Sequence, residues 1–145
     1  MELKRVLKPD GSIIIAESNH GAFYCYPHST AAIQVVDCLI RSQALASGNS
    51  LLGRELHPPL KKTGFDLPVV FPNIVNVDSS KPELVERFSK NTFTAMIEGV
   101  REKALALNLI DETTFDDGIR GLYRATAEDG TFCYTFFRGI ARKED

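Results

Sequence analysis

The chain has 145 residues, of which 43% are hydrophobic and 25% charged, a composition typical of one globular domain and unlike a disordered or collagen-like chain. Its 17 basic and 19 acidic side chains give a net charge of −2, so no general electrostatic attraction to nucleic acid or anionic membranes is expected. No apolar run approaches the ~20 residues of a membrane-spanning helix.

The first residues predict the end of a helix followed by a buried strand. Apolar side chains share one helical face within residues 1–8, and Pro9 with Asp10-Gly11 ends that face in a turn. Residues 12–16 (SIIIA) form a continuous apolar run, typical of a parallel strand buried on both faces. Because a parallel strand needs a parallel neighbour, the chain is expected to begin in the middle of a larger sheet.

The next segment predicts loops and two helices. Residues 17–28 are polar and aromatic without a clear period and predict irregular structure. Ser29 or Thr30 can cap a helix that continues to about Ala46. Residues 51–63 predict a shorter helix, made irregular by two prolines and ended by Gly64 as a left-handed cap.

The second half predicts an edge strand, two long helices and a final strand. Residues 65–77 are rich in β-branched side chains but contain Pro68 and Pro72, which confines this strand to a sheet edge. Residues 79–107 predict a helix that Gly99 kinks or splits, and Asp111 caps another helix that ends near residue 128. Residues 131–141 predict the clearest strand. Strands alternating with helices indicate the α/β class.

Three segments resemble the C-terminal half of class I S-adenosylmethionine-dependent methyltransferases (methyltransferase type 11). Residues 1–17, MELKRVLKPDGSIIIAE, are similar to the family's helix ending in RVLKPGG and its fifth strand, with Asp10 where glycine is usual. Residues 53–56 (GREL) and 59–65 (PLKKTGF) look like the helix before the sixth strand. Residues 129–143, from DGTF to ARK, are similar to the seventh strand.

The resemblance implies a single partial methyltransferase-like domain over residues 1–145. Its α/β fold would be the C-terminal half of a Rossmann-like sheet, with strands equivalent to 5, 6 and 7 of the family. The family's sheet order places strand 7 between strands 5 and 6, with strand 7 antiparallel and strand 6 at the edge. Residues 79–128 would then be a helical insertion between the last two strands, able to cap a substrate pocket.

The cofactor motif of the family is missing from the matched segments. The family binds S-adenosylmethionine with a glycine-rich turn after its first strand and an acidic residue that ends its second strand. None of the ten glycines has G-x-G spacing, so we expect this chain alone to bind no cofactor, whereas the intact family uses S-adenosylmethionine. Two functions stay open: methyl transfer to a small-molecule acceptor in the intact enzyme, or a non-catalytic ligand-binding or split-partner module.

Candidate site residues follow the first strand, because ligands of open α/β sheets bind beyond the carboxyl ends of strands. His20 is a candidate general base, since the ordinary pKa of histidine is ~6.5, and the alternative is an exposed loop histidine. Other side chains are candidates for substrate binding, although the tyrosines can instead pack against a helix and the glutamate can cap one. These candidates are Glu17, Asn19, Tyr24, Tyr26 and His28.

Two further motifs have simpler explanations. His20-x4-Cys25-x2-His28 contains zinc-binding residue types, but no second ligand pair accompanies it, so no metal is expected. Residues 118–121 (GIRG) are similar to the G-x-x-G loop that clamps nucleic acid, but they lie inside a helical pattern. We therefore expect no nucleic-acid partner.

The cysteines and the first strand predict location and association. Three widely spaced cysteines, an odd number, indicate reduced thiols in a cytoplasmic protein, with Cys38 and Cys133 as core residues. One side of residues 12–16 would lack a neighbouring strand, which predicts a homodimer, with exchange of elements between protomers as a variant. The expected interface side chains are Leu3, Val6, Ile13 and Ile15.

Overall fold

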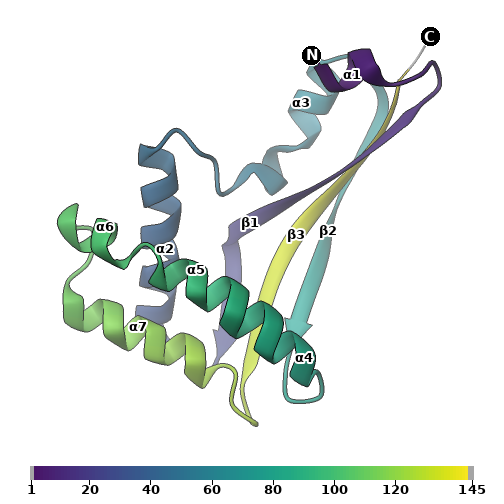
Figure 1. Ribbon diagram of the computed structural model, residues 1–145. Coiled ribbons are helices and arrows are strands. Elements are labelled where there is room, and N and C mark those ends of the chain that lie inside the picture. Colours follow the sequence, from purple (N-terminus) through teal and green to yellow (C-terminus); the bar gives the residue numbers. More distant parts are fainter. Residues whose placement is uncertain (1, 144–145) are drawn as a thin grey trace.

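The computed structural model describes residues 2–143, which form a three-stranded open sheet with helices packed at both of its ends (Figure 1). The strands are β1 (Ser12–Tyr26), β2 (Phe65–Val77) and β3 (Thr131–Lys143). Their order is β1-β3-β2, with β3 in the middle and antiparallel to both neighbours. The predicted α/β class and the edge position of the proline-containing strand β2 are confirmed.

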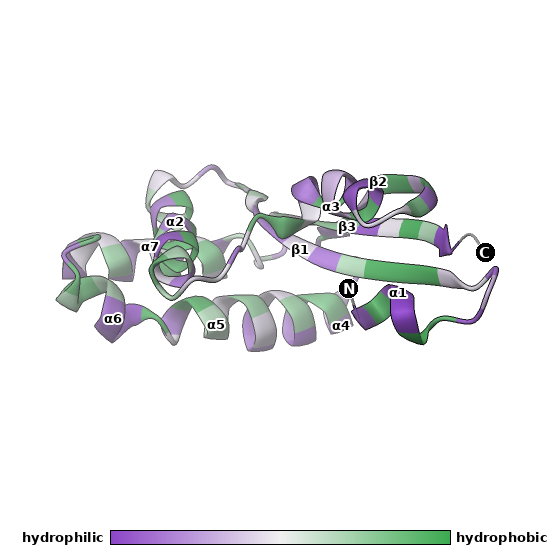
Figure 2. Ribbon diagram, turned by 90° about the horizontal axis from the view of Figure 1, so that it is seen from above, coloured by the Kyte–Doolittle hydropathy of each residue, from purple (hydrophilic) through white to green (hydrophobic). Residues whose placement is uncertain are grey.

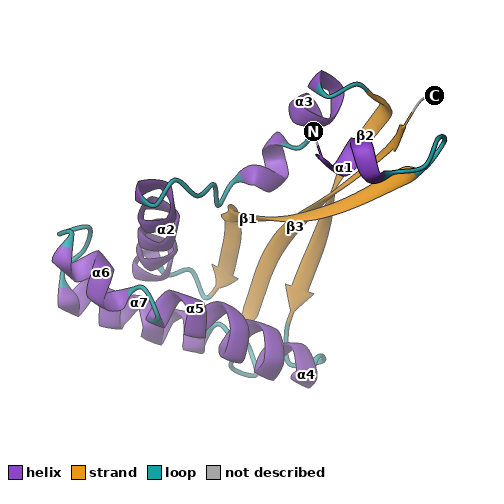
Figure 3. Ribbon diagram, turned by 45° about the horizontal axis from the view of Figure 1, so that its top comes forward, coloured by secondary structure: helices purple, strands orange, loops and turns teal. Residues whose placement is uncertain are grey.

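Except for α1, which precedes β1, the helices occupy the two long connections between strands (Figure 3). Ser29 caps α2 by accepting a hydrogen bond from the Ala32 amide, and Asp111 caps α7 by accepting one from the Thr114 amide. Gly99 ends α5 and so splits the predicted long helix. The helical elements are α1 (Glu2–Val6), α2 (Thr30–Leu45), the 3-10 helix η1 (Leu52–Glu55), α3 (His57–Lys62), α4 (Pro82–Leu84), the π-helix η2 (Val85–Thr94), α5 (Ala95–Glu98), α6 (Arg101–Ala106) and α7 (Glu112–Arg124).

Strand β1 differs from the sequence-based predictions in its length and in its burial. Residues 17–28 were expected to be irregular, but β1 continues through Tyr26, with a shift in register to β3 between Asn19 and Tyr24. This irregularity interrupts the alternation of side chains that would have identified a strand. Residues 12–16 are also not buried on both faces, because Ile14 is 67% exposed. Only the face with Ile13 and Ile15 is covered, where both side chains pack against the cluster under α3.

Two hydrophobic cores divide the sheet between them. The larger core joins one end of the sheet to α2, η2, α5, α6 and α7, and the smaller one lies where α3 covers the other end. An aromatic cluster forms the centre of the larger core, with Phe93, Phe132 and Tyr134 all at 2% exposure or less. The smaller core is built on Leu60, Phe65 and Ala141. Each core therefore fixes one half of the twisted sheet.

The packing of α2 against α7 gives a first prediction. A Cβ at Gly118 would lie 2.5 Å from Val35 Cγ1 and 2.6 Å from the Ala31 carbonyl oxygen. Gly118→Ala should therefore destabilise the protein toward the upper end of the ~1–3 kcal/mol typical of overpacking. This loss exceeds the ~1 kcal/mol gained from helix propensity, because the backbone oxygen cannot move aside easily.

Gly99→Ala is the matched control for this prediction. Its φ is −62° and a Cβ there would approach no atom closer than 3.4 Å. The substitution should be neutral or stabilise by up to ~1 kcal/mol. Urea unfolding followed by circular dichroism compares the two variants, and equal stabilities would contradict the close helix packing described above.

Candidate functional site

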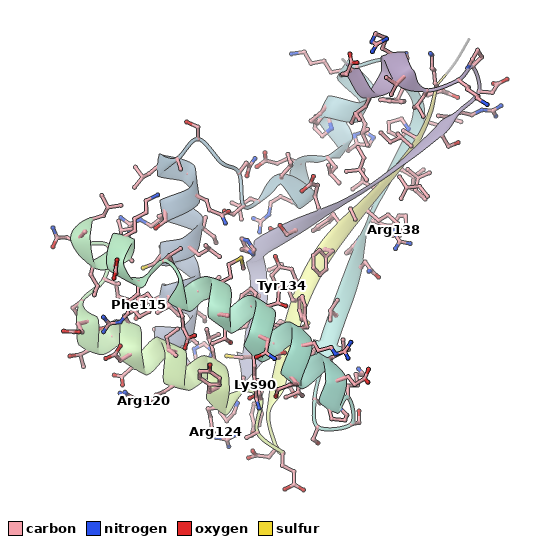
Figure 4. All side chains as sticks on the ribbon, in the orientation of Figure 1. Lys90, Phe115, Arg120, Arg124, Tyr134 and Arg138 are labelled. Carbon is pink, nitrogen blue, oxygen red and sulfur yellow. The ribbon has the colours of Figure 1, made fainter. Side chains whose placement is uncertain are left out.

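A cavity of about 330 Å³ opens at the larger core, between the sheet and the continuous helix formed by α4, η2 and α5. Ser18 and His20 of β1 and Tyr134 of β3 lie on its sheet side, and Figure 4 shows Tyr134 on β3 behind the helix from α4 to α5. The remaining lining residues come from α2, the loop after it, η2, α5 and β3: Gln43, Asn49, Ser50, Phe88, Thr92, Phe93, Met96 and Phe136.

The π-helix η2 supplies one wall of this cavity. Its ten residues place Phe88, Thr92 and Phe93 at the cavity. Its wide turn is supported by threonine side chains that donate back five residues, from Thr92 to the Arg87 carbonyl at 2.7 Å and from Thr94 to the Ser89 carbonyl at 2.8 Å. Segments with π geometry are rare and occur frequently at functional sites.

His20 and Tyr134 form the central polar pair of the cavity. The His20 Nδ1 atom and the Tyr134 hydroxyl oxygen are 2.6 Å apart, and only 6% of His20 is exposed. The His20 amide also donates to the Ser50 carbonyl at 3.1 Å, which ties β1 to the loop after α2. Among the described residues, no hydrogen bond reaches the other ring nitrogen, Nε2.

Burial keeps both partners of this pair uncharged near neutral pH. Desolvation lowers the pKa of His20 below its ordinary value. Desolvation also raises the pKa of Tyr134 to about 12, against opposing hydrogen bonds from Ser18 and the Asn19 backbone. The pair has two neutral arrangements: either Tyr134 donates to Nδ1 and Nε2 carries the proton, or Nδ1 donates to the tyrosine and Nε2 is an acceptor.

The lowered pKa of His20 predicts how stability depends on pH. The unfolded chain protonates this histidine below its ordinary pKa of 6.5, whereas the folded chain resists protonation. Below that pH the unfolded state binds more protons, so stability falls as the pH drops from 6.5 toward the lowered value. The charged side chains nearby are Asp37 of α2, beside His20 in a second cavity of about 220 Å³, and Arg54 of η1.

The measurement is urea unfolding at about pH 7.5 and about pH 5.5, on either side of this transition. His20→Gln should lose less stability than the wild-type chain between the two pH values, because the variant has no imidazole to protonate. Equal losses in the two proteins would contradict the proposed burial of a neutral histidine.

The other candidate residues lie outside the cavity. Asn19 is buried and accepts a hydrogen bond from Arg54 Nε at 2.9 Å, so it joins β1 to η1. Glu17 is half-buried on β1. Gly53 packs closely against its backbone, since a Cβ added at Gly53 would lie 2.9 Å from the Glu17 carbonyl oxygen. The remaining three candidates are exposed at or beyond the far end of β1: Tyr24, Tyr26 and His28. Of the predicted set, only His20 lines the cavity.

Most cavity residues were not predicted as a site. Phe88 and Met96 belong to a helical stripe that sequence reasoning assigns to the core, and Tyr134 and Phe136 belong to a strand that it assigns to the sheet. One signal was available: Tyr134 and Phe136 are two residues apart, so they share one face of β3. The polar residues Asn49 and Ser50 carried no comparable signal.

Several structural facts bear on the wider predictions. Among residues 2–143, no three histidine, cysteine or acidic side chains gather where they could hold a metal ion. The three cysteines are unpaired and buried, and Cys38 and Cys133 are core residues as predicted. Within the same residues, no helix is both long and apolar enough to cross a bilayer.

Comparison with known proteins gives no match: no protein-family model fits the chain, and no curated protein is similar to it in sequence. The cavity and its His20–Tyr134 pair, together with the sheet order, are therefore the features on which a function can be argued.

Proposed function

We propose that the chain is the C-terminal, substrate-side half of a class I S-adenosylmethionine-dependent methyltransferase, whose intact form methylates a small molecule. The observation that carries this proposal is the sheet order β1-β3-β2 with β3 antiparallel. The resemblance implies that order for strands 5, 7 and 6 of the family. In this arrangement β1 and β2 share one direction and β3 runs antiparallel between them, as the resemblance implies.

Local backbone geometry supports the same proposal. Asp10 has a φ of 59°, in the left-handed region that favours glycine, and it stands where the family has glycine. Aspartate is among the residues that tolerate this conformation. Gly53, in the GREL segment, has no room for a side chain, because a Cβ would lie 2.9 Å from the carbonyl oxygens of Glu17 and Ser18.

The cavity is the proposed site of the methyl acceptor. The segment that follows β2 forms its outer wall through η2 and α5, which agrees with the role of a capping insertion over residues 79–128. His20 is the proposed general base. With Nδ1 donating to Tyr134, Nε2 can accept the proton of an acceptor hydroxyl as that oxygen becomes nucleophilic.

The described residues do not fit the cofactor. A glycine turn for S-adenosylmethionine would follow a strand and open a helix. Among residues 2–143, the one glycine with positive φ is Gly64, at 73°, and it precedes β2. We therefore derive no step through the cofactor. This observation favours the second candidate function, a non-catalytic ligand-binding or split-partner module.

The test is to read the coding sequence upstream of Met1 and to express the longer chain that it encodes. We expect an in-frame strand, glycine-rich turn and helix, and a longer protein that binds S-adenosylmethionine in calorimetric titration. The 145-residue chain should show no binding, because it lacks the turn and the ribose-binding acid.

Two outcomes contradict this prediction. Binding of about one S-adenosylmethionine per 145-residue chain would show that the cofactor site lies within it. If a stop codon lies directly upstream and no co-purifying polypeptide contains a glycine-rich turn, the methyltransferase proposal fails and the ligand-binding module remains.

A homodimer and a cytoplasmic location complete the proposal. Three unpaired, buried cysteines support a reducing compartment, and burial raises the pKa of Cys25 and Cys38. The edge of β1 along residues 12–16 pairs with β3 on one side only. Ile14, rather than Ile13 or Ile15, is the exposed apolar side chain of that segment, while Leu3 and Val6 are exposed on α1.

A further inference from the structure

The cavity beside His20 has no charged lining. Its eleven lining residues carry amides, hydroxyls, a thioether, aromatic rings and one imidazole that burial keeps neutral. The carboxylate one step away, that of Glu55, accepts a hydrogen bond from Asn49 Nδ2 at 2.8 Å and so already has a partner. A ligand with a formal charge would lose its hydration here without gaining an opposite charge.

Aromatic rings form the apolar wall and set the shape that fits it. The Tyr134 ring lies 4.9 Å from Phe136, 5.3 Å from Phe93 and 5.7 Å from Phe88, measured between centroids, and all three pairs are T-shaped. Rings in such edge-to-face clusters leave faces and edges that pack well against another flat ring. Met96 adds a thioether, which also contacts aromatic rings favourably.

Polar groups beside the Tyr134 ring, on the sheet side of the cavity, can bond one small neutral group. His20 Nε2 is a donor in one tautomer of the His20–Tyr134 pair and an acceptor in the other. A hydroxyl both donates and accepts, so it can bond Nε2 in either tautomer. Ser18 lies on the same side but bonds to Tyr134, and the Ser50 hydroxyl already donates to Gln43 Oε1.

From these observations we infer that the cavity binds an uncharged, planar aromatic molecule with one or two rings and a hydroxyl group that bonds to His20. Ligand cavities span roughly 300–1,000 Å³. The volume of this cavity, about 330 Å³, lies at the small end of that range, so larger ring systems do not fit. This inference deepens the proposed function, because such a phenol would be the methyl acceptor. Binding can nevertheless be measured without any cofactor.

The test is calorimetric titration of the chain with three probes that share a naphthalene ring system: 2-naphthol, naphthalene and 2-naphthoate. We expect saturable binding of 2-naphthol, weaker binding of naphthalene, and at least roughly tenfold weaker binding of 2-naphthoate, which carries an unpaired charge at neutral pH. Equal affinities for 2-naphthol and 2-naphthoate would overturn the inference, as would no binding of 2-naphthol.

Two variants show whether the binding occurs in this cavity. Met96→Trp should fill the space and abolish binding, whereas Ile74→Trp, at an exposed position of β2, should leave the affinity unchanged. His20→Phe should reduce the affinity for 2-naphthol to that for naphthalene. Circular dichroism confirms folding of each variant, and full binding by a folded Met96→Trp chain would overturn the assignment.

The outcome is separable from that of the methyltransferase proposal. If the longer chain binds S-adenosylmethionine but the cavity rejects 2-naphthol, only the ligand class is wrong. If the cavity binds 2-naphthol but no glycine-rich turn exists upstream, the ligand class stands and the methyltransferase proposal fails.

Discussion

Phe93→Ala should lower the free energy of unfolding by about 3–5 kcal/mol, the range for removing a buried aromatic side chain. Phe93 is 2% exposed, and its ring centroid lies 5.0 Å from Phe132 and 5.3 Å from both Phe23 and Tyr134. It is the contact through which η2 packs on two strands at once. Domains of this size have a total stability of about 5–15 kcal/mol, so this single change removes a large fraction of it.

The measurement is equilibrium unfolding in urea, followed by circular dichroism. Phe71→Ala is the matched control, because Phe71 is 38% exposed on the edge strand β2. Phe71→Ala should lower the free energy of unfolding by well below half as much as Phe93→Ala, because a partly exposed ring loses less apolar contact. If the two variants lose equal stability, the aromatic cluster is not the centre of the larger core.

Local signals in the sequence were sufficient to place most elements. Ser29 and Asp111 are strong N-caps, and each begins a helix at the predicted position. Gly64 adopts positive φ just before β2, and Pro68 and Pro72 sit in a strand at the sheet edge. These features depend on a few neighbouring residues, so the sequence alone could reveal them.

Features that depend on distant contacts were missed. The extension of β1 to Tyr26 requires pairing with β3, and its register shift hides the alternation of side chains. The covered face of residues 12–16 depends on α3, which follows forty residues later in the chain. A period along one strand cannot reveal which of its faces another element will cover.

In the candidate site, too, some features depend on neighbouring residues and others on distant contacts. His20 could be selected from its residue type and its position after a short apolar run. Its partner Tyr134 is 114 residues away, and the pocket walls come from four separate stretches of the chain. Sequence position gives no measure of burial, which is what lowers the pKa of His20 and makes this histidine neutral.

The second large effect is expected on association. Ile14 of β1, Ile140 of β3 and Val69 of β2 are register partners, and they form one exposed apolar row, with 67%, 37% and 58% exposure. Figure 2 shows the hydrophobic stretch in the first half of β1, with α1 alongside it. Two copies related by a two-fold axis would extend the sheet through the edge of β1 and bring the two Ile14 side chains against each other.

Ile14→Lys should convert the proposed dimer into a monomer. A lysine on an edge strand prevents pairing, and the loss of a central apolar contact typically costs about 2 kcal/mol or more, which is roughly thirtyfold in Kd. Light scattering at micromolar concentration should give twice the chain mass for the wild-type protein and the single-chain mass for the variant.

Ile74→Lys separates this edge from a general loss of surface hydrophobicity. Ile74 is 64% exposed, nearly as much as Ile14, but it belongs to β2 at the opposite edge of the sheet. This control should remain a dimer, and both variants should fold, since exposed substitutions usually change stability by less than about 0.5 kcal/mol. A wild-type chain that stays monomeric and well folded would mean that the edge of β1 is stable in water, and the argument for the dimer would fail. If instead Ile74→Lys alone gave a monomer, the interface would lie on β2, where Pro68 and Pro72 remove two of the backbone donors that strand pairing needs.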